Sequence, residues 1–87
     1  MRLKYAFETM ELDDQIVAVP VGDGSEEFRG VVKLNEEAAF VFNLLKEEIS
    51  EESIVNAMAE TYDAPRDTLA ADVHKCVADF MEKGLLS

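Results

Sequence analysis

The stretch GVVKLNEEAAFVFNLL, residues 30–45, passes directly from a strand pattern to a helix pattern. Its first part alternates apolar and polar residues, with Lys33 on the face opposite its two neighbours. Asn35 is a favourable N-cap residue, and the two glutamates after it suit the positive end of a helix dipole. Apolar residues then recur every three or four positions. The sequence therefore predicts a strand over residues 28–34 that leads straight into a helix over residues 36–46.

Two further strands are predicted upstream of this stretch. Residues 5–12 alternate weakly, and residues 15–21 form a compact run rich in β-branched side chains. Pro20 places the end of the second strand at an edge or exit, because proline cannot donate to a strand ladder. Residues 13–14 are two aspartates that predict a hairpin turn, and residues 22–25, GDGS, give the strongest turn signal in the chain.

Two further helices are predicted downstream. Ser50 caps a helix over residues 51–63, and Pro65 lies in the first turn of a third helix that Gly84 ends. Residues 85–86 are leucines, which we expect to fold back as a hydrophobic tail. Strands followed by helices predict an α+β domain, with the helices on one face of a three-stranded antiparallel sheet.

Length and composition favour one domain, residues 1–87, around one core. The chain has 87 residues, 48% of them apolar and 31% charged. Its uncharged apolar runs are shorter than the roughly 20 residues of a membrane-spanning helix. Acidic residues follow the first five positions where a secretory signal would be apolar, and Cys76 is the only cysteine. We therefore expect a cytoplasmic protein in a reducing compartment, without an internal disulfide.

The charge balance argues against nucleic acid and anionic membranes as partners. Nineteen acidic and eight basic side chains give a net charge of −11, which opposes approach to a phosphate backbone. We interpret the acidic excess as a solvated surface; attraction of a basic partner is the alternative.

The side chains that carry most enzyme chemistry form no constellation here. His74 is the only histidine and lies out of phase with the apolar stripe of its helix, so we interpret it as a surface residue. Cys76 lies at that stripe and is interpreted as a small core residue, with a reactive thiol as the alternative. Glutamate pairs flank helix ends, where capping explains them, and no glycine-rich phosphate loop is present. The sequence predicts no catalytic residue, metal site or cofactor.

A sheet of only three strands must leave an edge unpaired, and such an edge can accept an extended peptide. The alternative is that Arg29, Lys33 and twist simply protect it. On the third predicted strand, one face carries Phe28, Gly30, Val32 and Leu34, and the other carries Arg29, Val31 and Lys33.

Several short motifs are spread over nearly the whole chain: the IVAVPVG run at 16–22, residues 30–45, Ile54-Val55, Tyr62, Asp72-Val73, Phe80 and the closing Gly84-Leu85-Leu86. With these motifs the chain resembles the PqqD-like family, the peptide chaperones of pyrroloquinoline quinone biosynthesis and their relatives. It is also similar to the recognition elements of ribosomally made, modified peptides. The chain departs from many relatives between the first two helices, where EEIS replaces an Asp-Gly turn.

This resemblance implies a winged-helix-like fold and a non-catalytic role. The leader of a precursor peptide would join the third strand, lie against the third helix and be brought to a modifying enzyme, often a radical SAM protein. Lys33, Lys75 and Lys83 would meet acidic leader residues. The implied peptide-binding residues are Arg29, Gly30, Val31, Val32, Lys33 and Leu34 on the strand, and Leu69, Asp72, Val73, Lys75, Cys76, Val77, Asp79, Phe80 and Lys83 on the helix.

A winged-helix DNA-binding regulator is the main alternative, because the same order of elements can place a helix in a DNA groove. The third helix lacks the basic stripe that such a reader needs. Its charged residues are Arg66, Lys75 and Lys83 against Asp67, Asp72, Asp79 and Glu82. A small enzyme or a structural subunit of a larger assembly is a further alternative. The precursor, its modifying enzyme and the oligomeric state are left open.

Overall fold

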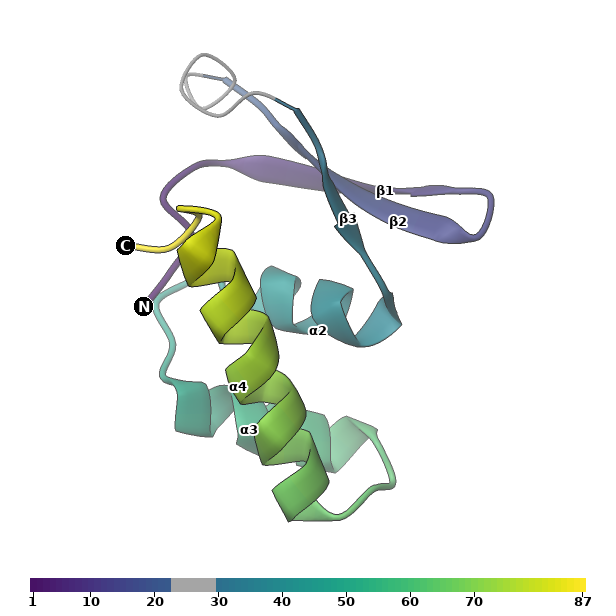
Figure 1. Ribbon diagram of the computed structural model, residues 1–87, viewed down its shortest axis with the longest axis vertical. Coiled ribbons are helices and arrows are strands. Elements are labelled where there is room, and N and C mark those ends of the chain that lie inside the picture. Colours follow the sequence, from purple (N-terminus) through teal and green to yellow (C-terminus); the bar gives the residue numbers. More distant parts are fainter. Residues whose placement is uncertain (23–29) are drawn as a thin grey trace.

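The predicted order of elements is confirmed: within residues 1–22 and 30–87, a three-stranded antiparallel sheet is followed by three helices (Figure 1). The computed structural model describes residues 1–22 and 30–87, so most of the GDGS turn, Phe28 and Arg29 lie outside the described residues. No helix in the described ranges is long and apolar enough to cross a membrane. The elements are β1 (Phe7–Leu12), β2 (Gln15–Pro20), β3 (Val32–Leu34), α2 (Glu36–Leu44), α3 (Glu51–Thr61) and α4 (Arg66–Glu82).

The third strand is shorter than predicted and begins at Val32, not at residue 28. Gly30 has a φ of 106°, which is outside the extended region, so it belongs to a turn and not to a strand face. β1 also starts two residues later than expected, at Phe7, and β2 ends at Pro20. The hairpin turn between β1 and β2 contains Asp13 in the left-handed region, with a φ of 57°.

The helices begin where the sequence predicts and end slightly early. Asn35 accepts a hydrogen bond from the amide of Ala38 at 2.7 Å, and Ser50 caps α3 through the amide of Ser53 at 3.1 Å. α3 ends at Thr61, because Tyr62 turns to extended backbone and its ring packs edge-on against Phe40, 5.5 Å between centroids. Pro65 is the N-cap of α4 and does not lie inside its first turn.

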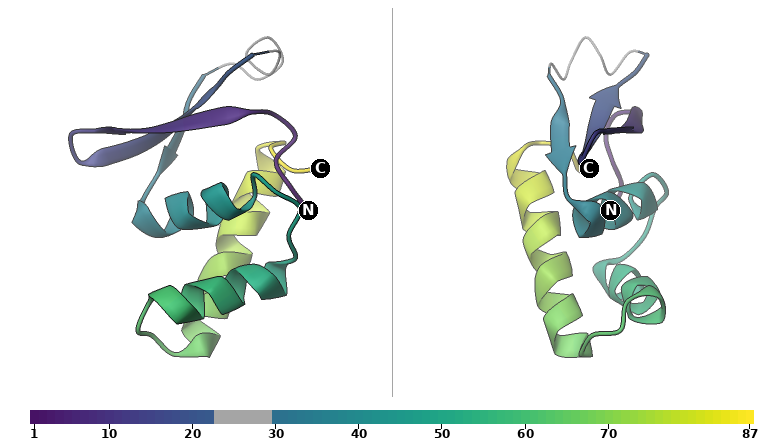
Figure 2. Two further views of the ribbon diagram at one scale, coloured as in Figure 1. Left: turned by 180° about the vertical axis from the view of Figure 1, so that it is seen from behind. Right: turned by 90° about the vertical axis from the view of Figure 1, so that its right-hand side faces the viewer.

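The sheet has the order β1-β2-β3, so β2 is central and β3 is an edge strand. Val17 on β2 pairs with Met10 on one side and Lys33 on the other. The helices lie on one side of the sheet, with α2 next to it and α4 running beside both α2 and α3 (Figure 2). This arrangement leaves the other face of the sheet without a covering helix in the described part of the chain.

The core lies between the sheet and the helices and is centred on Phe42, which is fully buried. Its ring meets Phe7 at 5.2 Å and Phe80 at 5.6 Å between centroids, both in edge-to-face geometry. These two aromatic contacts join β1, α2 and α4 in a single cluster.

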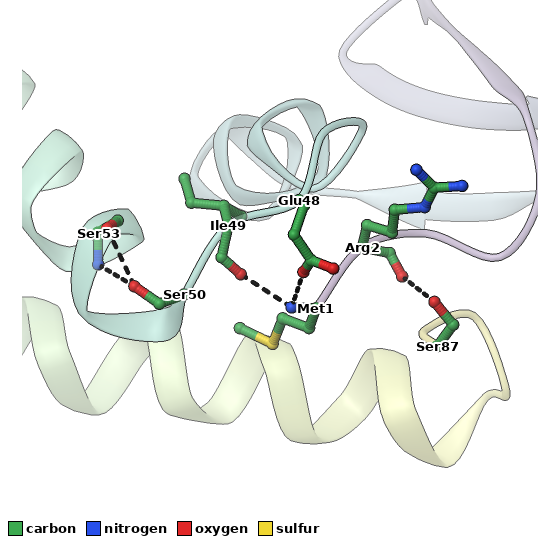
Figure 3. Close-up of polar contacts among 7 residues, drawn as sticks. All are labelled: Met1, Arg2, Glu48, Ile49, Ser50, Ser53 and Ser87. Carbon is green, nitrogen blue, oxygen red and sulfur yellow. Dashed lines mark hydrogen bonds and ion pairs between the residues drawn. The ribbon is translucent and has the colours of Figure 1, made fainter.

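The two ends of the described chain lie side by side. Leu3 pairs with Leu86 in an isolated antiparallel bridge, and Leu85 and Leu86 are buried, which confirms the predicted hydrophobic tail. The amino group of Met1 pairs with the Glu48 carboxylate and donates to the Ile49 carbonyl, next to the Ser50 cap of α3 (Figure 3). These contacts connect the first residues to the loop between α2 and α3.

Candidate functional site

The edge of β3 that faces away from β2 pairs with no other strand within residues 1–22 and 30–87. Side chains alternate along it: Val31 and Lys33 are exposed, whereas Val32 and Leu34 are buried in the core. Amide and carbonyl groups alternate in the same way, so about half of them point away from β2. This edge can therefore accept the backbone hydrogen bonds of another extended chain.

A groove of about 450 Å³ lies beside the start of α2 and the middle of α4. Four residues of α4 at positions i, i+3, i+4 and i+7 form one wall, because that spacing places them along one side of a helix. The first turn of α2 and the end of β3 complete the groove. Its lining residues are Lys33, Asn35, Glu37, Ala38, Asp72, Lys75, Cys76 and Asp79.

The structure corrects part of the expected helix wall. Leu69, Val73, Val77 and Phe80 have exposed fractions of 4% or less and belong to the core cluster, so they do not line the groove. Periodicity identifies the apolar side of a helix, but the core already uses that side fully. The groove wall is the adjacent, mostly polar stripe, with Asp72, Lys75, Cys76 and Asp79.

The sequence interpretation missed the contribution of α2 to the groove. Asn35, Glu37 and Ala38 lie at or just after the end of β3, and the sequence had assigned them only to capping and to the helix itself. The abrupt change from strand to helix is a signal for this arrangement. A helix that starts directly after an edge strand necessarily has its first turn beside the end of that strand.

Cys76 is half-buried at the border between the core and the groove, not fully inside the core as expected. Burial raises the pKa of its thiol, and the carboxylates of Asp72, Glu37 and Asp79 raise that pKa further, while Lys75 opposes them weakly. A raised pKa leaves less thiolate at neutral pH, which is the opposite of an activated nucleophile.

We expect iodoacetamide to alkylate Cys76 more slowly in the native protein than in denaturant at pH 7.5. Thiolate is the reactive form, and the native protein carries less of it because the folded-state pKa is raised. The native rate should keep rising at pH values where the denatured chain has already reached its maximum. Mass spectrometry follows the reaction on the single cysteine. Equal native and denatured rates at pH 7.5 would contradict this description of the thiol.

The three candidate lysines have different surroundings. Lys83 is already paired with Asp79, with 2.9 Å between Nζ and Oδ2. Lys75 lies in the groove stripe between Asp72 and Asp79, three and four residues away on the same helix. Lys33 is exposed on β3 and also lines the groove, and like Lys75 it has no ion pair among the described residues.

The remaining candidate residues lie outside this groove. His74 is a surface residue as predicted, with a side chain 75% exposed and Nδ1 3.3 Å from a Glu51 carboxylate oxygen. A second hollow at the β1-β2 turn is lined mainly by carboxylates. No group of His, Cys, Asp or Glu side chains suited to a metal ion occurs within the described residues.

The fold and the groove define a class: a small winged-helix-like α+β domain with an open strand edge beside a helix-walled groove. Residues 15–86 match the family model of coenzyme PQQ synthesis protein D (PqqD). The chain therefore belongs to the PqqD family, which confirms the resemblance seen in the sequence. A search among curated proteins finds no match.

Two solved structures have the same fold. One is TbiB1 in complex with the TbiA(beta) leader peptide, with a TM-score of 0.73 and 24% sequence identity. That match covers 100% of this chain and 95% of the other. The second is lasso peptide synthetase B1 complexed with the leader peptide, with a TM-score of 0.68 and 20% identity, covering 97% of this chain and 93% of that one.

Proposed function

We propose that this chain binds the leader segment of a ribosomally made precursor peptide as an added strand on β3 and presents it to a modifying enzyme. The observation that carries the proposal is the open edge of β3 beside a groove whose wall is α4. Main-chain hydrogen bonds along such an edge supply affinity, and alternate side-chain pockets supply specificity. Family membership supports the same role, as do the leader peptides in the two similar structures.

In this proposal the chain is a non-catalytic cytoplasmic chaperone, and a radical SAM protein is a candidate for the enzyme that it serves. The groove has a thiol of raised pKa and carboxylates without a histidine beside them, which suits binding better than acid-base or nucleophilic chemistry. The single free cysteine fits a reducing compartment.

The DNA-binding alternative gains no support. The helix that would enter a DNA groove, α4, carries Arg66 and Lys75 against four carboxylates. Arg66 is also engaged by the side chain of Asn56 on α3. A helix with excess negative charge cannot release counterions from DNA.

An NMR titration tests the proposed function. The isotope-labelled protein is titrated with the leader of a precursor encoded beside its gene, and the chemical shifts of its amides are followed. We expect the amides of residues 31–34 to shift together with those of Asp72, Cys76 and Asp79, because one bound strand contacts both the edge and the groove. The second edge of the sheet, β1, serves as an internal control and should stay unchanged. Shifts confined to β1, with residues 31–34 unaffected, would rule out the proposed site.

A further inference from the structure

The face of the sheet opposite the helices has an apolar centre that continues to the open edge. Val17 is only 6% exposed although it lies outside the core cluster, so neighbours on this outer face cover it. Its cross-strand partners are Met10 and Lys33. Val31 lies on the same side as Lys33, next to the open edge, and is 53% exposed. The outer face therefore ends at β3 with one apolar and one cationic side chain, two residues apart.

An added strand must place its own side chains alternately on the two faces of the sheet. Two of its residues, separated by one position, would stand beside Val31 and Lys33 on the outer face. The residue between them would point to the inner face, toward the groove. Ala38 and Cys76 are the half-buried apolar residues there, and both pack against the core.

Lys33 differs from the other two candidate lysines because it lies on β3 itself, whereas Lys75 lies on α4 and Lys83 directly after it. Among residues 1–22 and 30–87, neither Lys33 nor Lys75 has a carboxylate within ion-pair distance. Lys83 is held by Asp79, and Lys75 has carboxylates on both sides along α4. A cation on an open strand edge is stabilised by an opposite charge directly across the new strand pair. The net charge of −11 disfavours additional acidic residues elsewhere in the same peptide.

We propose, resting on strand addition to β3, that the chain selects a three-residue pattern in its peptide. An acidic side chain stands opposite Lys33, an apolar side chain two positions away stands opposite Val31, and an apolar residue between them enters the groove. The pattern holds for either strand direction, with its order reversed. Lys33 is then the residue that determines charge specificity, because it lies on the strand that the peptide joins, at the margin of the groove.

A displayed library of random 15-residue peptides, selected on the folded protein, tests this pattern. Binders are first sorted by whether they shift the amides of residues 31–34. Among those that do, we expect enrichment of Asp or Glu at one position, with apolar residues at the next two positions on one side of it. Repeating the selection with Lys33→Glu should replace the acidic residue with Lys or Arg at that position.

For a single selected acidic peptide, Lys33→Glu should weaken binding about threefold to tenfold, the scale of losing a cross-strand ion pair and gaining a like-charge pair. Changing the peptide's acidic residue to lysine should restore binding to that variant. Lys46→Glu is the matched control, because it makes the same charge change at an exposed position outside the groove and the β3 edge. It should alter neither the affinity by more than about twofold nor the selected pattern.

The outcomes separate this inference from the proposed function. Some outcomes overturn the pattern and leave strand addition intact. In these, the binders shift the amide signals of residues 31–34, but they show no preference for an acidic residue, or that preference is unchanged with Lys33→Glu. Binders that shift only other parts of the chain overturn both. Equal losses with Lys33→Glu and Lys46→Glu would show a general charge effect and would also overturn the role of Lys33.

Discussion

Proline at one position of β3 is expected to weaken leader binding about tenfold or more, with the fold retained. The position is 32 or 33, whichever has its amide directed to the open edge. Proline removes one ladder donor and adds a ring where the incoming strand must approach. The loss of one main-chain hydrogen bond alone corresponds to about 1 kcal/mol, and the steric block adds to it. The effect should therefore exceed that of any single charge change at the site.

Comparison of the two positions tests the direction of the amide. Neighbouring amides of a strand point in opposite directions, so one of the two bonds to β2 and the other faces the open edge. Hydrogen exchange on the free protein identifies the edge-facing amide, because it exchanges faster. Proline at position 32 also replaces a core side chain that is 3% exposed, so each proline variant is compared with alanine at the same position. Relative to alanine, proline at the β2-facing position should lower the melting temperature further, whereas proline at the edge-facing position should mainly reduce binding in calorimetry. Unchanged binding with a folded edge-facing proline variant would contradict strand addition.

Replacing Phe42 with alanine is expected to lower the free energy of unfolding by about 3–5 kcal/mol, the cost of truncating a large, fully buried aromatic side chain. Phe42 is 0% exposed and contacts both Phe7 and Phe80, so the cavity would open at the junction of β1, α2 and α4. The total free energy of unfolding of a small domain is only about 5–15 kcal/mol, so much of the variant population should unfold on mild heating.

Urea denaturation monitored by circular dichroism measures this loss. Met81→Ala is the control, because Met81 is a large apolar residue on α4 but is 57% exposed. It should change stability by no more than about 0.5 kcal/mol, as surface substitutions usually do. Similar losses in the two variants would show that Phe42 does not hold the three elements together.

Local signals in the sequence were sufficient for most of the fold. Asn35 and Ser50 begin helices because a side-chain oxygen can accept from an amide two or three residues later, which depends on neighbouring residues only. The same holds for the alternation that placed Val32 and Leu34 inside and Lys33 outside. Gly30 was misjudged because strand alternation cannot detect that a glycine has a positive φ.

The site depended on contacts between distant parts of the chain. Periodicity placed Leu69, Val73, Val77 and Phe80 on one side of α4, but one apolar stripe can serve either a core or a ligand. Only the docking of α4 against α2 and α3 decided that this stripe is buried and that the adjacent one faces the groove. Cys76 lies at their border, which is why its environment is intermediate between the two.

The sequence by itself determined the order of elements, the helix caps and the family, because each follows from residues close together in the chain. The tertiary structure alone decided which candidate lysine lies on the strand edge that a peptide can join. Lys83 meets Asp79 within one helical turn, and Lys75 lies on α4, whereas the place of Lys33 depends on which strands surround it. Lys33 lies at an open edge because, within the described residues, β3 pairs with β2 alone, so half of its backbone groups are left for another strand.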